Sequence, residues 1–287
     1  MEINQKQATK LGILPQISLS PAIAKCCLRV CAKTSYQQAE EDLWMLMRVK
    51  VGHSSLHRLV ARSEFPALQT DKESQQISGI SIDGGKICLR GKESEGGQWR
   101  DYKLVSFHQG GCEAFFQDPD GLQQWSEQQN LAPIITLLGD GHLGIWKTMM
   151  SFALSKWLIR REVLDWYHLK ENLYKAGGSL KRLKFVENLL WHGAVERAIE
   201  QLEGLKSKRF QRLIAYLTTH RSRIPNYDTY QRLGIPIGSG DVESKIKQVS
   251  ARVKLSGARW HRDNVPQILR LRCAYLNRSS LLTLQTH

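Results

Sequence analysis

Three acidic residues stand in sequence contexts that set them apart from the other acids. Asp83 lies within the apolar stretch ISGISIDGGKICLR and is followed directly by two glycines. Asp140 ends the apolar run PIITLLGD, and Glu243 follows the glycine-rich segment GIPIGSGD. An acid at the tip of a buried strand is costly unless its charge is compensated. These contexts indicate that the three acids have a chemical role and that the neighbouring glycines leave room for a highly charged ligand.

Carboxylates that converge at one point can compensate one another by holding divalent cations. Oxygen ligands favour Mg²⁺ or Mn²⁺, which commonly keep waters and substrate phosphates as their remaining ligands. Two such ions suit an in-line displacement at phosphorus, because one activates the attacking oxygen and the other stabilises the leaving oxygen. The pattern predicts a two-metal phosphoryl-transfer site with Asp83, Asp140 and Glu243 as metal ligands.

Each of these acids taken alone has a plainer interpretation as a cap or turn residue. Asp241 illustrates it, because it stands two residues before Glu243 and is interpreted as the N-cap of the helix that follows. The combination of three such acids in compatible elements on a basic chain favours the metal site.

The chain is strongly basic, with a formal net charge of +14 over 287 residues. A protein this basic normally meets a polyanion, most often nucleic acid. Cationic side chains concentrate after Glu243, where they would neutralise phosphates, and Trp260 would stack on an unpaired base. The plainer alternative is a solvated basic face with one core tryptophan. The predicted DNA-binding residues are Lys245, Lys247, Arg252, Lys254, Arg259, Trp260 and Arg262.

The elements that must position these groups alternate between strand and helix. Residues 77–90 and 99–109 alternate in hydropathy and predict an antiparallel hairpin. A helix is expected over 118–130, followed by a strand over 133–141 that is buried on both faces. A helix over 142–154 and a strand over 157–165 complete a mixed α/β fold. Helical patterns then run from 168 to about 232 and again over 242–278.

The N-terminal part is also helical in pattern. Ser35–Met47 places Tyr36, Ala39, Leu43 and Leu46 on one face, and a second helix capped by Ser54 follows a short break. This outline is typical of a helix-turn-helix, whereas a plain helical hairpin packed for stability explains it equally well. Residues 1–20 are expected to be an irregular lead-in, and 66–76 a polar linker.

Composition bears on location and redox state. The six cysteines lack zinc spacing, and Cys26, Cys27 and Cys31 lie in an apolar stretch where cysteine usually behaves as a small buried hydrophobe. Residues 1–20 carry no secretory core, and no apolar run approaches the roughly 20 residues that span a bilayer. We therefore expect a cytoplasmic protein with reduced thiols and no membrane partner.

Four stretches between about residue 80 and residue 275 resemble the transposases of bacterial insertion sequences of the ISKra group, relatives of the Mutator-type superfamily. They are GISIDGGKI, LLGDGHLGIW, VLDWYHLKENLY and GIPIGSGDVESKIKQVSARVKLSGARW, and the last two are fairly specific. The resemblance implies an α/β, ribonuclease-H-like mixed-sheet catalytic core in which Asp83, Asp140 and Glu243 form the DDE triad. It also implies that Asp165 and His168 are a D-x-x-H element near the scissile phosphate. The alternative there is an Asp N-cap followed by a satisfied core histidine.

The resemblance further implies metal-dependent cleavage of DNA at the element's ends and strand transfer into target DNA, by a homo-oligomer that bridges two ends. In a bacterium such a protein would be nucleoid-associated. The expected parts are a helical segment over 1–65, a ribonuclease-H-like core over 77–167 and 234–280, and an all-helical insertion over 168–233.

Two other functions remain open at this point. The chain could be a catalytically inactive, transposase-derived DNA-binding protein, although its triad is complete. It could also be a ribonuclease-H-like nuclease of repair, which the helical insertion disfavours. Only about 75 residues precede the first core strand, fewer than in most members of the family, so a short variant or a truncated copy is expected.

Overall fold

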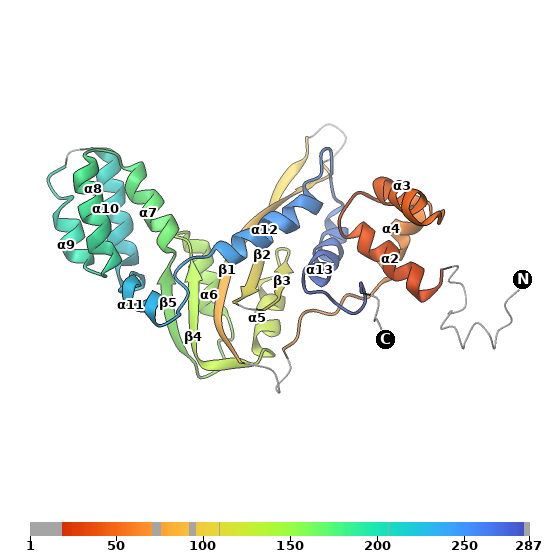
Figure 1. The fold of residues 1–287 in the computed structure, drawn as a ribbon, viewed down its shortest axis with the longest axis horizontal. Helices are drawn as coiled ribbons and strands as arrows, with labels where there is room; N and C mark the ends of the chain where they lie inside the picture. Colours follow the sequence, from red (N-terminus) through yellow and green to blue (C-terminus); the bar gives the residue numbers. More distant parts are fainter. Residues whose placement is uncertain (1–18, 71–75, 92–95, 109, 206, 284–287) are drawn as a thin grey trace, which may run out of the picture.

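The computed structural model describes residues 19–70, 76–91, 96–108, 110–205 and 207–283, and its centre is a mixed sheet in the order β3-β2-β1-β4-β5 (Figure 1). The pairs β1–β2 and β2–β3 are antiparallel, whereas β1–β4 and β4–β5 are parallel. In the described part of the chain the strands are β1 (Ile77–Leu89), β2 (Gln98–Phe107), β3 (Cys112–Phe115), β4 (Leu131–Gly139) and β5 (Ile159–Leu164).

The mixed α/β organisation that the sequence predicts is confirmed, including the β1–β2 hairpin. β3 was not expected, because its four residues CEAF are too few to show alternation; β3 extends the sheet by pairing with β2. The helices between the strands are α5 (Pro119–Glu127) and α6 (Leu143–Ser151), and both end three residues earlier than predicted.

Helices fill the chain between β5 and residue 232, and the described residues there include no strand, as predicted. Figure 1 shows most of them at the end of the molecule opposite the N-terminal helices. The elements are α7 (Trp166–Lys175), α8 (Leu180–Trp191), α9 (Val195–Glu200), α10 (Lys208–His220), η1 (Arg221–Arg223) and α11 (Tyr227–Arg232).

The other helices are found at the N-terminus and after residue 239. They are α2 (Pro21–Cys31), α3 (Tyr36–Met47), α4 (His53–Arg62), α12 (Gly240–Val253), η2 (Arg262–Asn264) and α13 (Val265–Leu276). α12 runs across the sheet from the side of the helical insertion toward α2–α4 (Figure 1).

Two hydrophobic cores cover the two faces of the sheet. Ile80 and Ile82 of β1 belong to a core that continues through α5 and α6 into the inserted helices. Ile87 and Leu89 belong to the other core, which includes α12, α13 and the N-terminal helices. Successive strand residues point to opposite faces, so Asp83 shares the α12 face with Ile87 and Leu89. This alternation directs the acid of β1 toward the helix that carries Glu243.

The N-terminal helices form as predicted, with two differences. Ser35 caps α3 by accepting from the Gln38 N–H (3.1 Å), but Leu46 is 79% exposed rather than packed, because it lies in the last turn. Ser54 is not the N-cap of α4, because the helix begins at His53. The N-cap residue is Gly52, and the cap has no side-chain hydrogen bond. The buried faces of α3 and α4 pack in the second core, and a DNA-binding role for them remains a prediction.

Two of the three N-terminal cysteines behave as buried hydrophobes, as predicted. Cys27 and Cys31 are fully buried, and burial raises the pKa of their thiols to about 11 and about 12. Cys26 is half-buried. Most of the lead-in expected over residues 1–20, and part of the linker expected over 66–76, lie outside the described residues. In the described chain no helix combines the length and the apolarity needed to cross a membrane.

The glycines beside the acids do not all leave open space, contrary to expectation. A Cβ at Gly85 would lie 2.1 Å from the Tyr102 ring, and one at Gly141 would lie 2.2 Å from the Tyr216 ring. Gly84 is different, because the nearest atom to its Cβ position is Lys103 Nζ at 3.7 Å. Two of these glycines therefore admit tyrosine rings rather than a ligand.

Substituting Gly85→Ala should lower the free energy of unfolding by about 1–3 kcal/mol, because buried Tyr102 cannot move aside without disturbing the core. Gly84→Ala is the matched control, since its methyl group would meet no atom closer than Lys103 Nζ at 3.7 Å. Urea unfolding of both variants measures the difference, and equal stability of the two would contradict this packing.

Candidate metal and catalytic site

Asp83 and Asp140 lie on neighbouring strands. β1 and β4 are parallel, with Gly79 opposite Thr136 and Ser81 opposite Leu138. Continuing this register by two residues places Asp83 beside Asp140, which directly follows β4. The Asp140 carboxylate accepts the His142 N–H (2.9 Å), so the turn into α6 orients it. Ligand sites of α/β sheets commonly lie at this carboxyl end of parallel strands.

The electrostatics of Asp83 show which groups share its surroundings. Burial is the largest influence and raises the pKa of Asp83, although the Gly84 N–H, which donates to its carboxylate, acts in the opposite direction. The negative charges of Asp140 and Glu243 raise the pKa further, and His168 lowers it. Asp140, Glu243 and His168 therefore lie near enough to Asp83 to influence its pKa.

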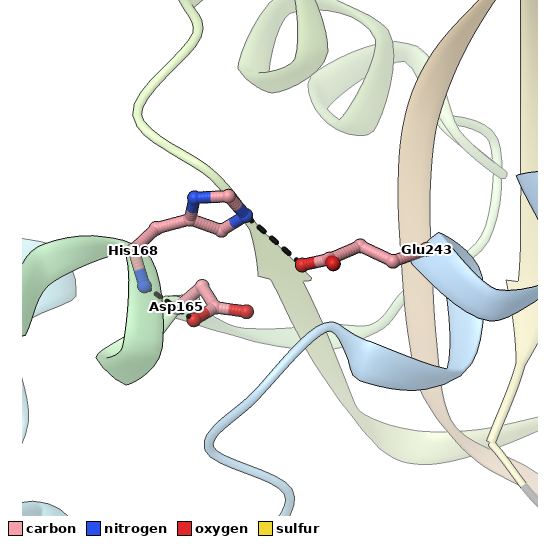
Figure 2. Close-up of side chains that lie close together, drawn as sticks. All are labelled: Asp165, His168 and Glu243. Carbon is pink, nitrogen blue, oxygen red and sulfur yellow. Dashed lines mark hydrogen bonds and ion pairs between the residues drawn. The ribbon is translucent and has the colours of Figure 1, made fainter. Parts of the chain in front are cut away.

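Glu243 and His168 face each other from the first turns of two helices (Figure 2). His168 Nε2 lies 3.0 Å from Glu243 Oε1, and the two side chains are 36% and 35% exposed. An ionised carboxylate only accepts hydrogen bonds, so Nε2 carries the proton when Glu243 is charged. His168 is thus not a satisfied core histidine, because part of its ring stays open to solvent.

Asp165 holds the starts of these two helices together. It is fully buried, and it caps α7 by accepting the His168 N–H at 2.9 Å (Figure 2). Its other oxygen accepts both the N–H and the hydroxyl of Ser239, which stands at the N-cap position of α12. The N-cap interpretation of Asp165 is confirmed, and Asp165 positions His168 and Glu243.

Among the residues that the structure describes, one group of side chains has its ligand atoms close enough together to hold a metal ion. Ligand atoms of Asp165, His168 and Glu243 lie within 4.8 Å of one another. However, a cation bound to Asp165 would have to displace hydrogen bonds from three donors. Asp83, Asp140 and Glu243 do not form such a group in the described chain, so a metal site shared by these three acids remains a prediction. Its chemical basis is that the carboxylates are partly exposed and repel one another, and a divalent cation would relieve that repulsion.

Asp241 is not the N-cap of α12, contrary to the sequence prediction. It lies in the first turn and accepts the Ser106 hydroxyl and Lys245 Nζ (2.9 Å). Lys245 Nζ also donates to Ser106 Oγ (2.7 Å) and to the Gly110 carbonyl (2.9 Å). These three acceptors use every ammonium proton, so Lys245 fastens α12 to β2 and is not free for DNA. The four-residue spacing of Asp241 and Lys245 could have indicated this pair.

Arg252 and Trp260 also differ from the exposed DNA contacts that the sequence predicts. Arg252 is 2% exposed, and its Nε donates to the Cys31 carbonyl (2.7 Å). Trp260 is half-buried, its indole N–H donates to the Val253 carbonyl (2.9 Å), and its backbone pairs with the end of β1. The other four predicted contacts are exposed and remain predictions: Lys247, Lys254, Arg259 and Arg262.

No protein-family model matches this chain, and no curated protein sequence matches it significantly.

Substituting Asp83→Asn should raise the melting temperature in metal-free buffer. The pKa of Asp83 is raised in the folded state, so stability falls as pH rises from the ordinary aspartate pKa to the raised one, and the loss persists at neutral pH. The asparagine side chain is uncharged, so the variant does not lose this stability at neutral pH. Mg²⁺ should stabilise the wild type by about 1.4 kcal/mol at ten times its Kd and the variant by less.

Thermal unfolding with and without Mg²⁺ measures both effects. Asp101→Asn on β2 is the matched control, because it removes an exposed carboxylate outside the site. Equal stabilisation of wild type and Asp83→Asn by Mg²⁺ would remove Asp83 from the metal site.

Proposed function

We propose that this protein is a DDE-type DNA transposase that cleaves DNA at the ends of an insertion sequence and transfers the strands into target DNA. The observation that carries the proposal is the placement of Asp83 and Asp140 at the carboxyl ends of neighbouring parallel strands, with Glu243 and His168 near enough to influence the pKa of Asp83. The net charge of +14 supports a polyanionic substrate.

The sheet supports a ribonuclease-H-like core of the kind that the family resemblance implies. Three antiparallel strands are continued by two parallel ones in the order β3-β2-β1-β4-β5. The three acids lie on this sheet or on the helix that covers it. Asp83 is on central β1, Asp140 directly follows neighbouring β4, and Glu243 is on α12, which crosses the same face. The inserted helices separate the second and third acids in sequence, as the resemblance also implies.

Each group of residues at the site would have a separate role in the reaction. Bound Mg²⁺ or Mn²⁺ ions would supply charge stabilisation and activation of the attacking oxygen at the phosphorus. Asp83 and Asp140 are held by the sheet, so their oxygens are fixed before DNA arrives. His168 orients Glu243 through its Nε2 proton. Among the predicted contacts, Lys247, Lys254, Arg259 and Arg262 are exposed and can neutralise backbone phosphates.

Nicking of a plasmid that carries the DNA flanking the coding region tests this proposal. Wild-type protein should nick and join strands only with Mg²⁺ or Mn²⁺, and Asp83→Asn or Glu243→Gln should each reduce the rate by at least about 100-fold. Asp241→Asn is the matched control on α12 and should stay within about tenfold of wild type, because Asp241 binds Ser106 and Lys245.

Wild-type activity in Asp83→Asn would refute the catalytic assignment. DNA binding without nicking in the wild type would favour the inactive, transposase-derived alternative. Nicking without strand joining would favour a nuclease. Light scattering of the protein on paired DNA ends would test the homo-oligomer that the resemblance implies.

The nicking rate should also depend on pH through Asp83. Because the pKa of Asp83 is raised and metal ions bind the ionised carboxylate, the rate should fall on acidification above the pH at which an ordinary aspartate titrates. A higher Mg²⁺ concentration should move the midpoint to lower pH, since the cation competes with the proton. Rate profiles at two Mg²⁺ concentrations that coincide would contradict this coupling.

A further inference from the structure

A second site lies beyond the far end of α12 from Glu243. It is a cavity of about 790 Å³ between α3, α4 and the segment that follows α12. We call it the arginine pocket and define it by Tyr36, His57, Arg90, Arg252, Arg259 and Trp260. None of these residues belongs to the carboxylate site.

The arginine pocket has an excess of positive charge. Arg90, Arg252 and Arg259 line it, whereas the one lining carboxylate, Asp263, lies 3.3 Å from His261 Nδ1. Arg90 Nε donates to the Arg259 carbonyl (3.3 Å), and no other described residue bonds to the terminal nitrogens of either exposed side chain. The charge favours an anionic ligand.

Arg252 gives an independent indication of a ligand. Its guanidinium carbon lies 5.3 Å from the centre of the Tyr36 ring and 5.1 Å from that of Trp260, so two aromatic rings flank it. The side chain is 98% buried, yet Nη2 has no hydrogen-bond partner within the described chain. A buried cationic donor without an acceptor is costly. An acceptor brought by a ligand would remove that cost.

The aromatic side chains of the pocket suit a planar ring. His57 is exposed, and its ring meets the edge of Tyr36 with centroids 5.2 Å apart. Aromatic side chains beside arginines bind nucleotides by stacking on the base and pairing with the phosphate. Arg252 lies nine positions after Glu243 in α12, about 13.5 Å along the helix axis at about 1.5 Å per residue. A few nucleotides of an extended strand can cover this distance.

We propose that the arginine pocket binds an unpaired nucleotide of a DNA strand. The phosphate pairs with Arg90 and Arg259, the base stacks against His57, and a polar atom of the nucleotide accepts from Arg252. The choice of DNA as the ligand rests on the proposed function, whereas the preference for an anionic, planar group rests on the pocket alone.

Binding of the full chain to two fluorescent DNAs tests the proposal: a blunt duplex, and the same duplex with a short single-stranded tail. Anisotropy is measured in EDTA, so that cleavage does not interfere. The wild type should bind the tailed DNA about tenfold more tightly, and the double variant Arg90→Ala/Arg259→Ala should lose this preference. His57→Ala should reduce it several-fold.

The matched control is Arg197→Ala/Arg232→Ala, which removes the same charge from exposed positions on α9 and α11. It should keep the preference for the tailed DNA. Thermal unfolding shows whether each variant is folded, and buried Arg252 is left unchanged for that reason.

Equal wild-type binding of the two DNAs, or equal loss of preference in both double variants, would overturn the proposal. Competition by free deoxynucleoside monophosphate without any tail preference would assign the pocket a soluble nucleotide instead of a strand. Nicking activity without tail preference would refute only the pocket, whereas absence of all DNA binding would refute the proposed function as well.

Discussion

The buried carboxylate of Asp165 fixes the arrangement on which the candidate site depends. It joins the start of α7 to the start of α12, although Asp165 and Ser239 are 74 residues apart in the chain. A buried negative charge is tolerated there because backbone and hydroxyl donors occupy both oxygens. With the two helix starts joined, His168 and Glu243 meet across 3.0 Å. Loss of these hydrogen bonds would separate the side chains even if each helix stayed intact.

The same region combines two opposing electrostatic effects. Both oxygens of Asp165 accept hydrogen bonds. The ionised form of Asp83, in contrast, is disfavoured by burial and by the nearby charges of Asp140 and Glu243. Saturation with hydrogen-bond donors makes the first a structural group. Uncompensated charge makes the second a candidate ligand for a cation. Sheet geometry maintains this repulsion, because β1 and β4 are hydrogen-bonded to each other and cannot separate to relieve it.

Local patterns were sufficient to predict four of the five strands in the described chain, because hydropathy alternation and apolar runs are properties of adjacent residues. The roles of the three acids remain a prediction. Local patterns could not show which distant group each polar side chain meets. Lys245 and Arg252 resembled exposed phosphate contacts, but Ser106, Gly110 and Cys31 supply their acceptors from remote parts of the chain. Asp241 resembled an N-cap because spacing alone does not distinguish a cap from a first-turn residue that faces a strand.

The position of α12 in the chain has a consequence for protein synthesis. The strands that carry or precede Asp83 and Asp140 are complete by residue 140, but Glu243 follows the whole helical insertion. A growing chain therefore exposes two of the three carboxylates long before the third leaves the ribosome. Until α12 docks on the sheet, the nascent protein lacks one of the three carboxylates to which we assign metal binding.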